Sequence, residues 1–375
     1  MNVIFTCGGT GGHINPAIAV ANLIRERDPD GKILFVGAKG GMEEKLVPQA
    51  GYELVGLPAS SLKRKLTPKG IWQNVQGVGK ILSALMQVRK IIRDFDADIV
   101  VGTGGYASFP ALFMASQMGI PTCVHEANAY PGLATRLVAD RVDQILVCFE
   151  ESAKHYKQRD KVKTVGMPVR REFIYTTRAD ARKELGLDER PLIVSAFGSL
   201  GAMEMNKAMA DFMKLEVDEG CPWQHIHATG SFGWKWMPDL VKEKGVELEN
   251  ADGIQMLEYI YNMPTLMAAA DLVISRSGSG SCNEIAASGT PCIMIPSPNV
   301  TDNHQEKNAQ VLVDRGGCEM VLEKNCSGQK LFDLTKELLS DEQRRSAMRK
   351  ALLAWSVPDS AEQICDCIYA LARKN

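Results

Sequence analysis

The sequence has no CxxC pair, although it contains ten cysteines. The closest pair, Cys365 and Cys367, is separated by a single aspartate. This spacing predicts neither a zinc site nor a disulfide framework, so we expect no metal ligand set and no disulfide scaffold. The cysteine pattern is compatible with a reducing cytoplasm.

An excess of one charge is also missing, because 43 Lys and Arg oppose 45 Asp and Glu. The sequence pI of about 6.3 gives no general attraction to nucleic acid, and we expect none as a partner. No apolar run reaches the roughly 18 to 20 residues that span a bilayer. Residues 1–6 lack the basic start and the long apolar stretch of a signal peptide. We therefore expect a soluble or peripheral protein.

Short apolar runs alternate with amphipathic helical patterns, which is typical of parallel β-sheets with crossover helices. The runs are "NVIFTC", "KILFVG", "ADIVVG", "PTCVHE", "DQILVCF", "PLIVSAFG", "QHIHATG", "DLVIS" and "PCIMIP". A chain of 375 residues exceeds the usual size of one core. We expect an α/β protein with two Rossmann-like, doubly wound domains over residues 1–165 and 166–357. The last helical pattern, over 358–375, could pack on either domain.

Three glycine-rich turns follow strand-like runs, over residues 7–13, 102–106 and 198–202. For the first turn we expect a helix from Pro16, with Asn15 as its N-cap. The glycine spacing matches neither the dinucleotide fingerprint nor the P-loop. Taken alone, each turn is better explained as a tight connection between a strand and a helix. Three such turns at strand ends together predict a cleft between the domains. Backbone N–H groups there would suit a diphosphate.

His13 closes the first glycine turn at a strand end. An imidazole titrates near neutral pH and can accept a proton from a sugar hydroxyl. We favour a general base at His13 over a capping or positioning role. We expect His155, His225 and His227 to be structural, since alternation on a strand explains His227.

Polar side chains follow another predicted strand in "VHEANAYPG", where His125, Glu126 and Asn128 lie close in sequence. No third ligand or nucleophile lies at a spacing that would complete a metal site or a catalytic triad. Hydrogen bonds to a substrate rich in hydroxyl groups suit these side chains better.

A second polar group follows the strand over 271–275, which ends at Arg276. Glu284, in the next predicted helix, can accept two hydrogen bonds from a ribose diol. From spacing alone it could equally stabilise the helix dipole. The later segment "NVTDNHQEKNA" supplies neutral polar groups that suit sugar hydroxyls, including His304 and Gln305.

Together these segments resemble the MurG family of peptidoglycan glycosyltransferases, within the GT-B superfamily. The matching motifs occur in the family order over nearly the whole chain. They are "GGTGGHINPA", "GTGGYASFPA", "HEANAYPGL", "GMPVR", "FGSLGA", "SRSGSGSCNEIAASGTP" and "PSPNVTDNHQEKNA".

The resemblance implies inverting transfer of N-acetylglucosamine from UDP-N-acetylglucosamine to the muramyl C4 hydroxyl of lipid I, with no cofactor. The C-terminal domain would hold most of the donor and the N-terminal domain the acceptor, across the interdomain cleft. His13 and Asn128 would be catalytic. The donor would contact Thr10, Gly11, Gly12, Arg170, Ser199, Ile260, Arg276, Glu284, His304 and Gln305. The acceptor would contact Gly104, Gly105, Tyr106 and Glu126.

Three motifs depart from the family pattern. Ala127 stands for the Gln of "HEQN" and Met167 for the Asn of "GNPVR", while Phe197 and Leu200 stand for the first Gly and the Gln of "GGSQGA". These changes leave a non-catalytic UDP-sugar-binding relative as one alternative. Another GT-B glycolipid glycosyltransferase and a UDP-N-acetylglucosamine epimerase are the others.

A lipid-linked acceptor implies a peripheral protein on the cytoplasmic side of the cell membrane, with cell-wall synthesis proteins as candidate partners. The segment over 61–90 combines basic residues with an apolar helical face, as membrane-surface helices do. The predicted membrane contacts are Lys63, Arg64, Lys65, Trp72 and Val75. From composition alone, an ordinary amphipathic helix packed in the domain explains the segment better, but the lipid-linked substrate that the resemblance implies favours membrane docking.

Overall fold

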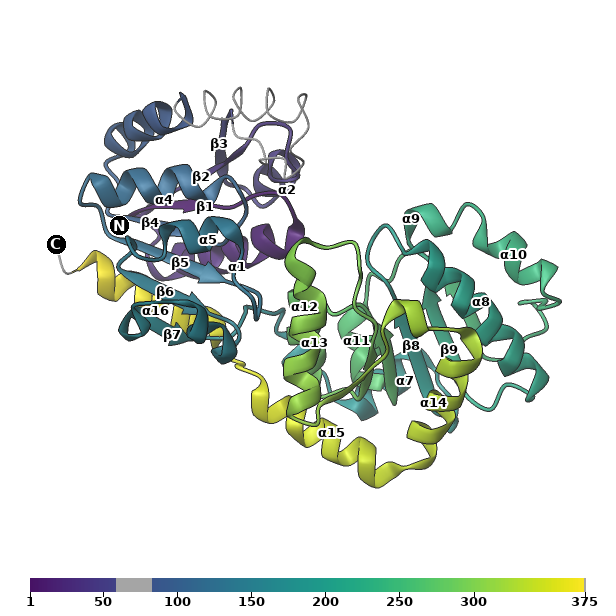
Figure 1. Ribbon diagram of the computed structural model, residues 1–375. Coiled ribbons are helices and arrows are strands. Elements are labelled where there is room, and N and C mark those ends of the chain that lie inside the picture. Colours follow the sequence, from purple (N-terminus) through teal and green to yellow (C-terminus); the bar gives the residue numbers. More distant parts are fainter. Residues whose placement is uncertain (59–82, 374–375) are drawn as a thin grey trace. The chain divides into compact units, whose positions relative to one another are not determined.

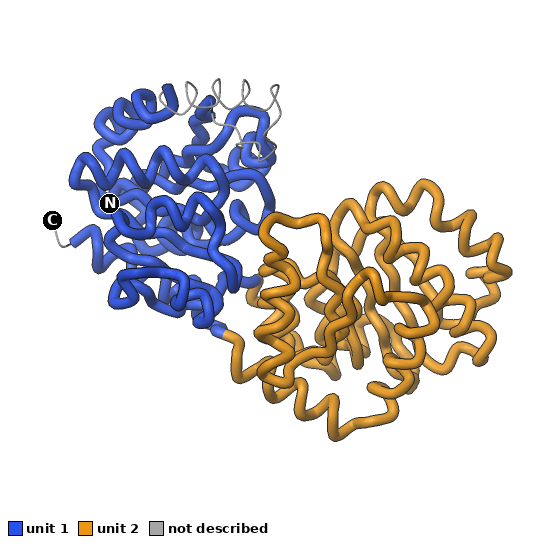
Figure 2. Tube along the Cα trace, viewed as in Figure 1, with its two compact units in different colours: residues 1–169, 357–375 blue, residues 170–356 orange. Residues whose placement is uncertain are grey.

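The structure is a computed structural model that describes residues 1–58 and 83–373 (Figure 1). The chain forms two compact units (Figure 2). Each unit contains its own sheet. Unit 1 comprises Met1–Val169 together with Val357–Asn375, and unit 2 comprises Arg170–Ser356.

Unit 1 is built on a seven-stranded parallel sheet in the order β3-β2-β1-β4-β5-β6-β7. The strands are β1 (Asn2–Thr6), β2 (Lys32–Ala38), β3 (Glu53–Leu57), β4 (Ile99–Gly102), β5 (Thr122–Glu126), β6 (Gln144–Val147) and β7 (Val162–Thr164). The helices are α1 (Gly11–Arg27), α2 (Glu43–Gln49), one with described residues 83–95, α4 (Ser108–Gln117), α5 (Leu133–Val138), the 3-10 turns η1 (Glu150–His155) and η2 (Arg159–Lys161), and α16 (Ser360–Ala372).

Alternate residues of β1 enter cores on opposite faces of this sheet, as the two-residue period of a strand requires. Val3 and Phe5 pack in the core that includes α1 and α16. Ile4 packs in the core that includes α4 and the helix over 83–95. The last helix of the chain thus belongs to unit 1, where it contacts α1.

The expected start of the first helix at Pro16, with Asn15 as its N-cap, is wrong. Helix α1 begins at Gly11 with Thr10 as the N-cap, and Pro16 lies inside it. The N–H groups of His13 and Ile14 both donate to the Thr10 carbonyl, at 3.0 and 3.2 Å. The helix therefore absorbs two glycines that the sequence pattern assigns to the turn, and His13 lies in its first turn.

Unit 2 is built on a six-stranded parallel sheet in the order β10-β9-β8-β11-β12-β13. The strands are β8 (Leu192–Ala196), β9 (Gln224–Ala228), β10 (Ile254–Leu257), β11 (Leu272–Ser275), β12 (Cys292–Met294) and β13 (Cys318–Met320). The helices are α6 (Glu172–Tyr175), α7 (Arg178–Leu185), α8 (Met203–Asp218), α9 (Gly230–Gly233), α10 (Met237–Glu243), α11 (Met263–Ala269), α12 (Ser279–Ser288), α13 (His304–Asp314), α14 (Gly328–Ser340) and α15 (Glu342–Trp355), with the 3-10 turns η3 (Thr301–Asn303) and η4 (Glu323–Asn325).

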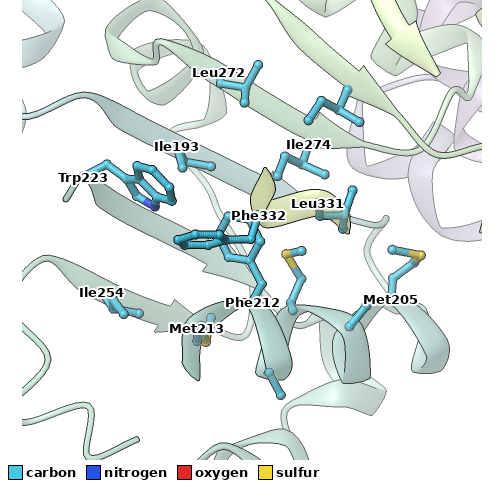
Figure 3. Packing of buried hydrophobic residues seen from close by; sticks show 14 of the residues in the cluster. Ile193, Met205, Phe212, Met213, Trp223, Ile254, Leu272, Ile274, Leu331 and Phe332 are labelled. Carbon is cyan, nitrogen blue, oxygen red and sulfur yellow. The ribbon is translucent and has the colours of Figure 1, made fainter. Parts of the chain in front are cut away.

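An aromatic cluster fills the core between this sheet and helices α8 and α14 (Figure 3). The Phe212 ring meets the Phe332 ring edge to face at 5.7 Å, and Trp223 lies 5.2 Å from Phe332. Such pairs add to the free energy gained by burying their area. The prediction of two doubly wound parallel sheets is confirmed, and in each unit the strands point their carboxyl ends at the predicted site loops.

Candidate functional site

His13 is held by the turn that follows β4. Its Nδ1 lies 3.0 Å from the Thr103 carbonyl oxygen, and the Thr103 hydroxyl donates to the His13 carbonyl at 2.7 Å. Because a carbonyl oxygen can only accept, Nδ1 carries the proton. In the neutral ring the lone pair is therefore on Nε2, which is the form that a general base requires.

Gly104 and Gly105 allow this turn to approach the first glycine turn. Gly104 has a φ of +100°, and a Cβ there would lie 2.6 Å from His13 Nδ1. Gly105 has a φ of +83°, and its Cβ would lie 2.1 Å from the Gly8 carbonyl oxygen. A side chain at either position would displace its neighbour, so both glycines are required by close approach as well as by backbone conformation. The structure brings these two predicted acceptor residues together with His13.

Glu126 and Asn128 form one connected loop after β5. The Glu126 carboxylate accepts hydrogen bonds from the Asn128 backbone N–H at 3.1 Å and from its side-chain amide at 3.3 Å. Its other oxygen accepts from the Gly132 N–H, at the start of α5, at 3.0 Å. Glu126 is buried and serves to orient Asn128. The adjacent His125 is fully buried with Nε2 2.8 Å from the Gly166 carbonyl, and burial lowers the pKa of its imidazole.

The third glycine turn, after β8, is joined to the loop after β9. The Ser231 N–H donates to the Ser199 carbonyl at 3.1 Å, and the Phe232 N–H donates to the Leu200 carbonyl at 3.2 Å. Gly201 has a φ of +79°, and its Cβ would lie 2.0 Å from the Thr229 carbonyl. Leu200, which replaces the family's Gln, has a side chain that is 56% exposed.

A cavity of about 400 Å³ opens beside this turn. It is lined by Ser199, Ser231, Trp234, Leu257, Glu258, Tyr259 and Tyr261. Ile260, one of the predicted donor contacts, lies within the same segment with a buried side chain. Aromatic walls with a few polar groups are common in pockets that bind rings.

Glu284 lies on α12, where the structure places it within electrostatic range of Arg170. Burial raises the pKa of the Glu284 carboxyl to about 7, and the charge of Arg170 opposes this rise. Because burial makes ionisation of this carboxyl unfavourable, a ligand that donates hydrogen bonds to the carboxylate stabilises its charged form.

Arg276 is engaged inside unit 2. One terminal nitrogen donates to the carbonyls of Ile295 and Pro296, at 3.1 and 3.3 Å, and the other pairs with the Glu323 carboxylate. The two side chains of this ion pair are only 12% and 16% exposed. Arg276 thus fastens the turn after β11 to the segments that follow β12 and β13.

The predicted sugar residues lie at the start of α13. The Gln305 side-chain oxygen accepts from the Ser297 N–H, and its backbone carbonyl accepts from the Ser277 hydroxyl, both at 2.9 Å. His304 Nδ1 lies 2.9 Å from the Thr301 carbonyl. These hydrogen bonds connect the loops after β11 and β12. Ser277, which forms one of them, was not among the site residues predicted from the sequence.

A Ser-His-Glu arrangement lies in the core of unit 2, formed by Ser195, His225 and Glu216. Ser195 Oγ is 2.7 Å from both His225 Nε2 and His227 Nδ1, and Glu216 is 2.9 Å from His225 Nδ1. All four side chains are fully buried, and burial lowers the pKa of His227 to about 3. A substrate cannot reach this serine, which agrees with a structural role for both histidines.

The predicted membrane contacts Lys63, Arg64, Lys65, Trp72 and Val75 lie outside the described residues. Within residues 1–58 and 83–373, no helix is long and apolar enough to cross a membrane. Over the same residues, no group of three or more His, Cys, Asp or Glu could hold a metal ion.

Comparison with known proteins identifies the family. Residues 3–147 match the glycosyltransferase family 28 N-terminal domain, and residues 192–364 match its C-terminal domain. The UDP-N-acetylglucosamine–N-acetylmuramyl-(pentapeptide) pyrophosphoryl-undecaprenol N-acetylglucosamine transferase of Acetivibrio thermocellus is 39% identical over 98% of this chain and 97% of its own. The protein of the same name from Thermoanaerobacter sp. strain X514 is 39% identical over 99% of this chain and 100% of its own.

Solved structures show the same fold. Acinetobacter baumannii MurG superposes with a TM-score of 0.78 at 23% identity, covering 98% of this chain and 99% of that one. A UDP-GlcNAc 2-epimerase from Neisseria meningitidis superposes with a TM-score of 0.64 at 15% identity, covering 99% and 100%. The fold alone is shared by transferases and epimerases, whereas the two full-length sequence relatives named above are transferases. The chain therefore belongs to glycosyltransferase family 28 and, within it, to the MurG family.

Proposed function

We propose that this chain transfers N-acetylglucosamine from UDP-N-acetylglucosamine to the muramyl C4 hydroxyl of lipid I, forming lipid II, with His13 as the general base. Membership of the MurG family supports the reaction. The observation that carries the role of His13 is its Nδ1 contact with the Thr103 carbonyl at 3.0 Å, which leaves the lone pair on Nε2.

The reaction is an inverting displacement. The C4 oxygen forms a bond to the anomeric carbon while the bond from that carbon to the UDP oxygen breaks, and UDP leaves with the electron pair. The hydroxyl proton passes to His13 Nε2. The Thr103 carbonyl accepts from Nδ1–H and so stabilises the imidazolium as it forms.

Unit 2 holds most of the donor in this proposal. Glu284 accepts from the ribose hydroxyls, and the Ile260 backbone meets the uracil. N–H groups at the starts of α8 and α12 face the diphosphate, where negative charge develops as UDP leaves. The remaining donor contacts come from Arg170, Ser199, Arg276, His304 and Gln305, and from Thr10, Gly11 and Gly12 of unit 1.

Unit 1 holds the acceptor, through the second glycine turn, Tyr106 and the loop that Glu126 and Asn128 form. Because lipid I is anchored in a bilayer, we place the protein on the cytoplasmic surface of the cell membrane. The basic and apolar residues within 59–82 supply that contact, and proteins of cell-wall synthesis are the proposed partners.

A transfer assay tests this function. The protein is incubated with a lipid I analogue and UDP-N-acetylglucosamine, UDP-N-acetylgalactosamine or UDP-glucose. We expect transfer with the first donor. Formation of free N-acetylmannosamine would support an epimerase, a preference for diacylglycerol would support a glycolipid synthase, and donor binding without transfer would support a non-catalytic relative.

A further inference from the structure

Glu43 is a fully buried carboxylate in unit 1 that the proposed mechanism does not use. It is the first residue of α2, after the turn that follows β2. Burying a carboxylate costs free energy unless hydrogen bonds compensate for the lost water. Its partners therefore indicate what the side chain does.

The carboxylate connects two segments that are distant in sequence. Oε1 accepts from the Ala38 N–H, at the end of β2, at 2.8 Å. Oε2 accepts from the Gly9 N–H, in the first glycine turn, at 3.3 Å. Glu43 thus fastens the turn that precedes His13 to the neighbouring strand.

Three glycines leave space for this one side chain. A Cβ at Gly8 would lie 2.6 Å from Oε1, one at Gly37 would lie 2.6 Å from Cγ, and one at Gly41 would lie 2.4 Å from the carboxyl carbon. These glycines come from three different segments. Their shared neighbour explains why each position lacks a side chain.

The first glycine turn, which Glu43 holds in place, also contacts the turn that supports the His13 ring. The Gly8 carbonyl is the atom that Gly105 approaches, and the adjacent Gly104 packs against the imidazole. A shift of Gly8 and Gly9 would therefore move the turn that also supplies the Thr103 carbonyl. The negative charge of Glu43 also reaches this turn, since it adds to the effect of burial in raising the pKa of the Tyr106 hydroxyl.

We propose that Glu43 is a positioning residue, whose buried carboxylate fixes the first glycine turn and thereby the orientation of the His13 imidazole. The proposal rests on the role of His13 as general base. It assigns no contact between Glu43 and either substrate.

Glu43→Gln tests this proposal because it keeps the side-chain size but places an NH₂ group against one of two N–H donors. We expect the single-turnover rate of transfer to fall at least 10-fold, with the dissociation constant of UDP-N-acetylglucosamine within twofold of the wild type. The matched control is Val47→Ala, which truncates another fully buried side chain of α2 and should lower the melting temperature without lowering the rate.

Nitrogen-15 NMR of the histidine rings measures the protonation of His13 Nδ1, which a loss of stability alone would not change. The His13 resonances are assigned by their absence in His13→Ala. We expect the Nδ1-protonated form in the wild type and in Val47→Ala, and a shifted or broadened Nδ1 signal in Glu43→Gln.

Gly41→Ala is the second variant, for use if Glu43→Gln does not fold. Its added methyl group displaces the carboxylate but keeps the charge, and we expect the same changes in rate and NMR signal. Wild-type rates and His13 signals in the folded variants would overturn the proposal. Equal rates in the wild type and His13→Ala would instead reject the general base, while the NMR comparison would still report on Glu43.

Discussion

The raised pKa of Glu284 makes donor binding depend on pH. In the free protein, burial raises the pKa of this carboxyl from 4.5 to about 7. The ribose hydroxyls donate hydrogen bonds, so they favour the ionised carboxylate and lower its pKa again. If binding returns the pKa to 4.5, the dissociation constant of UDP-N-acetylglucosamine should be about 30-fold higher at pH 5.5 than at pH 8.

The same decrease in the pKa of Glu284 predicts that the protein releases protons when UDP-N-acetylglucosamine binds. At pH 6, binding should release about 0.9 proton per site, falling to about 0.1 at pH 8. Calorimetry in two buffers of different ionisation enthalpy measures this number directly. Glu284→Gln should bind with little dependence on pH and release no proton, whereas Glu247→Gln, at an exposed position, should behave as the wild type. A wild-type dissociation constant that is unchanged from pH 5.5 to pH 8 would refute the reasoning.

The Glu284 carboxyl also affects folding stability, which should decrease as pH rises whereas donor binding tightens. A raised pKa means that the folded protein binds the proton more tightly than the unfolded chain. The free energy of unfolding should therefore decrease as pH rises from about 4.5 to about 7, by at most about 3 kcal/mol because the side chain is partly exposed. Bound UDP-N-acetylglucosamine should reduce this loss.

Three further predictions follow from other contacts. Gly104→Ala forces a methyl group to within 2.6 Å of His13 Nδ1, so transfer should fall at least about 10-fold and stability by about 1–3 kcal/mol in urea unfolding; a wild-type rate would contradict this. Glu323→Ala removes the carboxylate that neutralises the buried Arg276, and the free energy of unfolding in urea should fall by about 3 kcal/mol, with a smaller loss in Glu323→Gln. Replacing the basic residues 63–65 with Glu should reduce pelleting with anionic liposomes, and unchanged pelleting would remove the proposed membrane contact.

The sequence predicted secondary structure best where the residues of a single strand or helix determine the hydrophobic pattern. Apolar runs such as "KILFVG" and "DLVIS" gave strands β2 and β11, because buried parallel strands are apolar on both faces. The four edge strands β3, β7, β10 and β13 were missed, because they are only partly buried and lack the continuous apolar runs of the inner strands. The first helix was placed too late because its two glycines were assigned to the turn.

Site residues were harder to predict where a side chain has a partner from a distant segment. The ring tautomer of His13 depends on Thr103, 90 residues away in sequence. The engagement of Arg276 depends on Glu323 in a segment beyond β13. Glu43 carries no motif of its own, although the three glycines around it were a signal that only the folded chain explains.

The direct test of the account is the single-turnover rate of transfer in His13→Ala, measured at saturating UDP-N-acetylglucosamine with a lipid I analogue. We predict a rate about 100-fold or more below the wild type, because a missing general base costs at least this factor, together with an unchanged donor dissociation constant. A rate within threefold of the wild type would contradict the assignment of His13 as the group that accepts the proton.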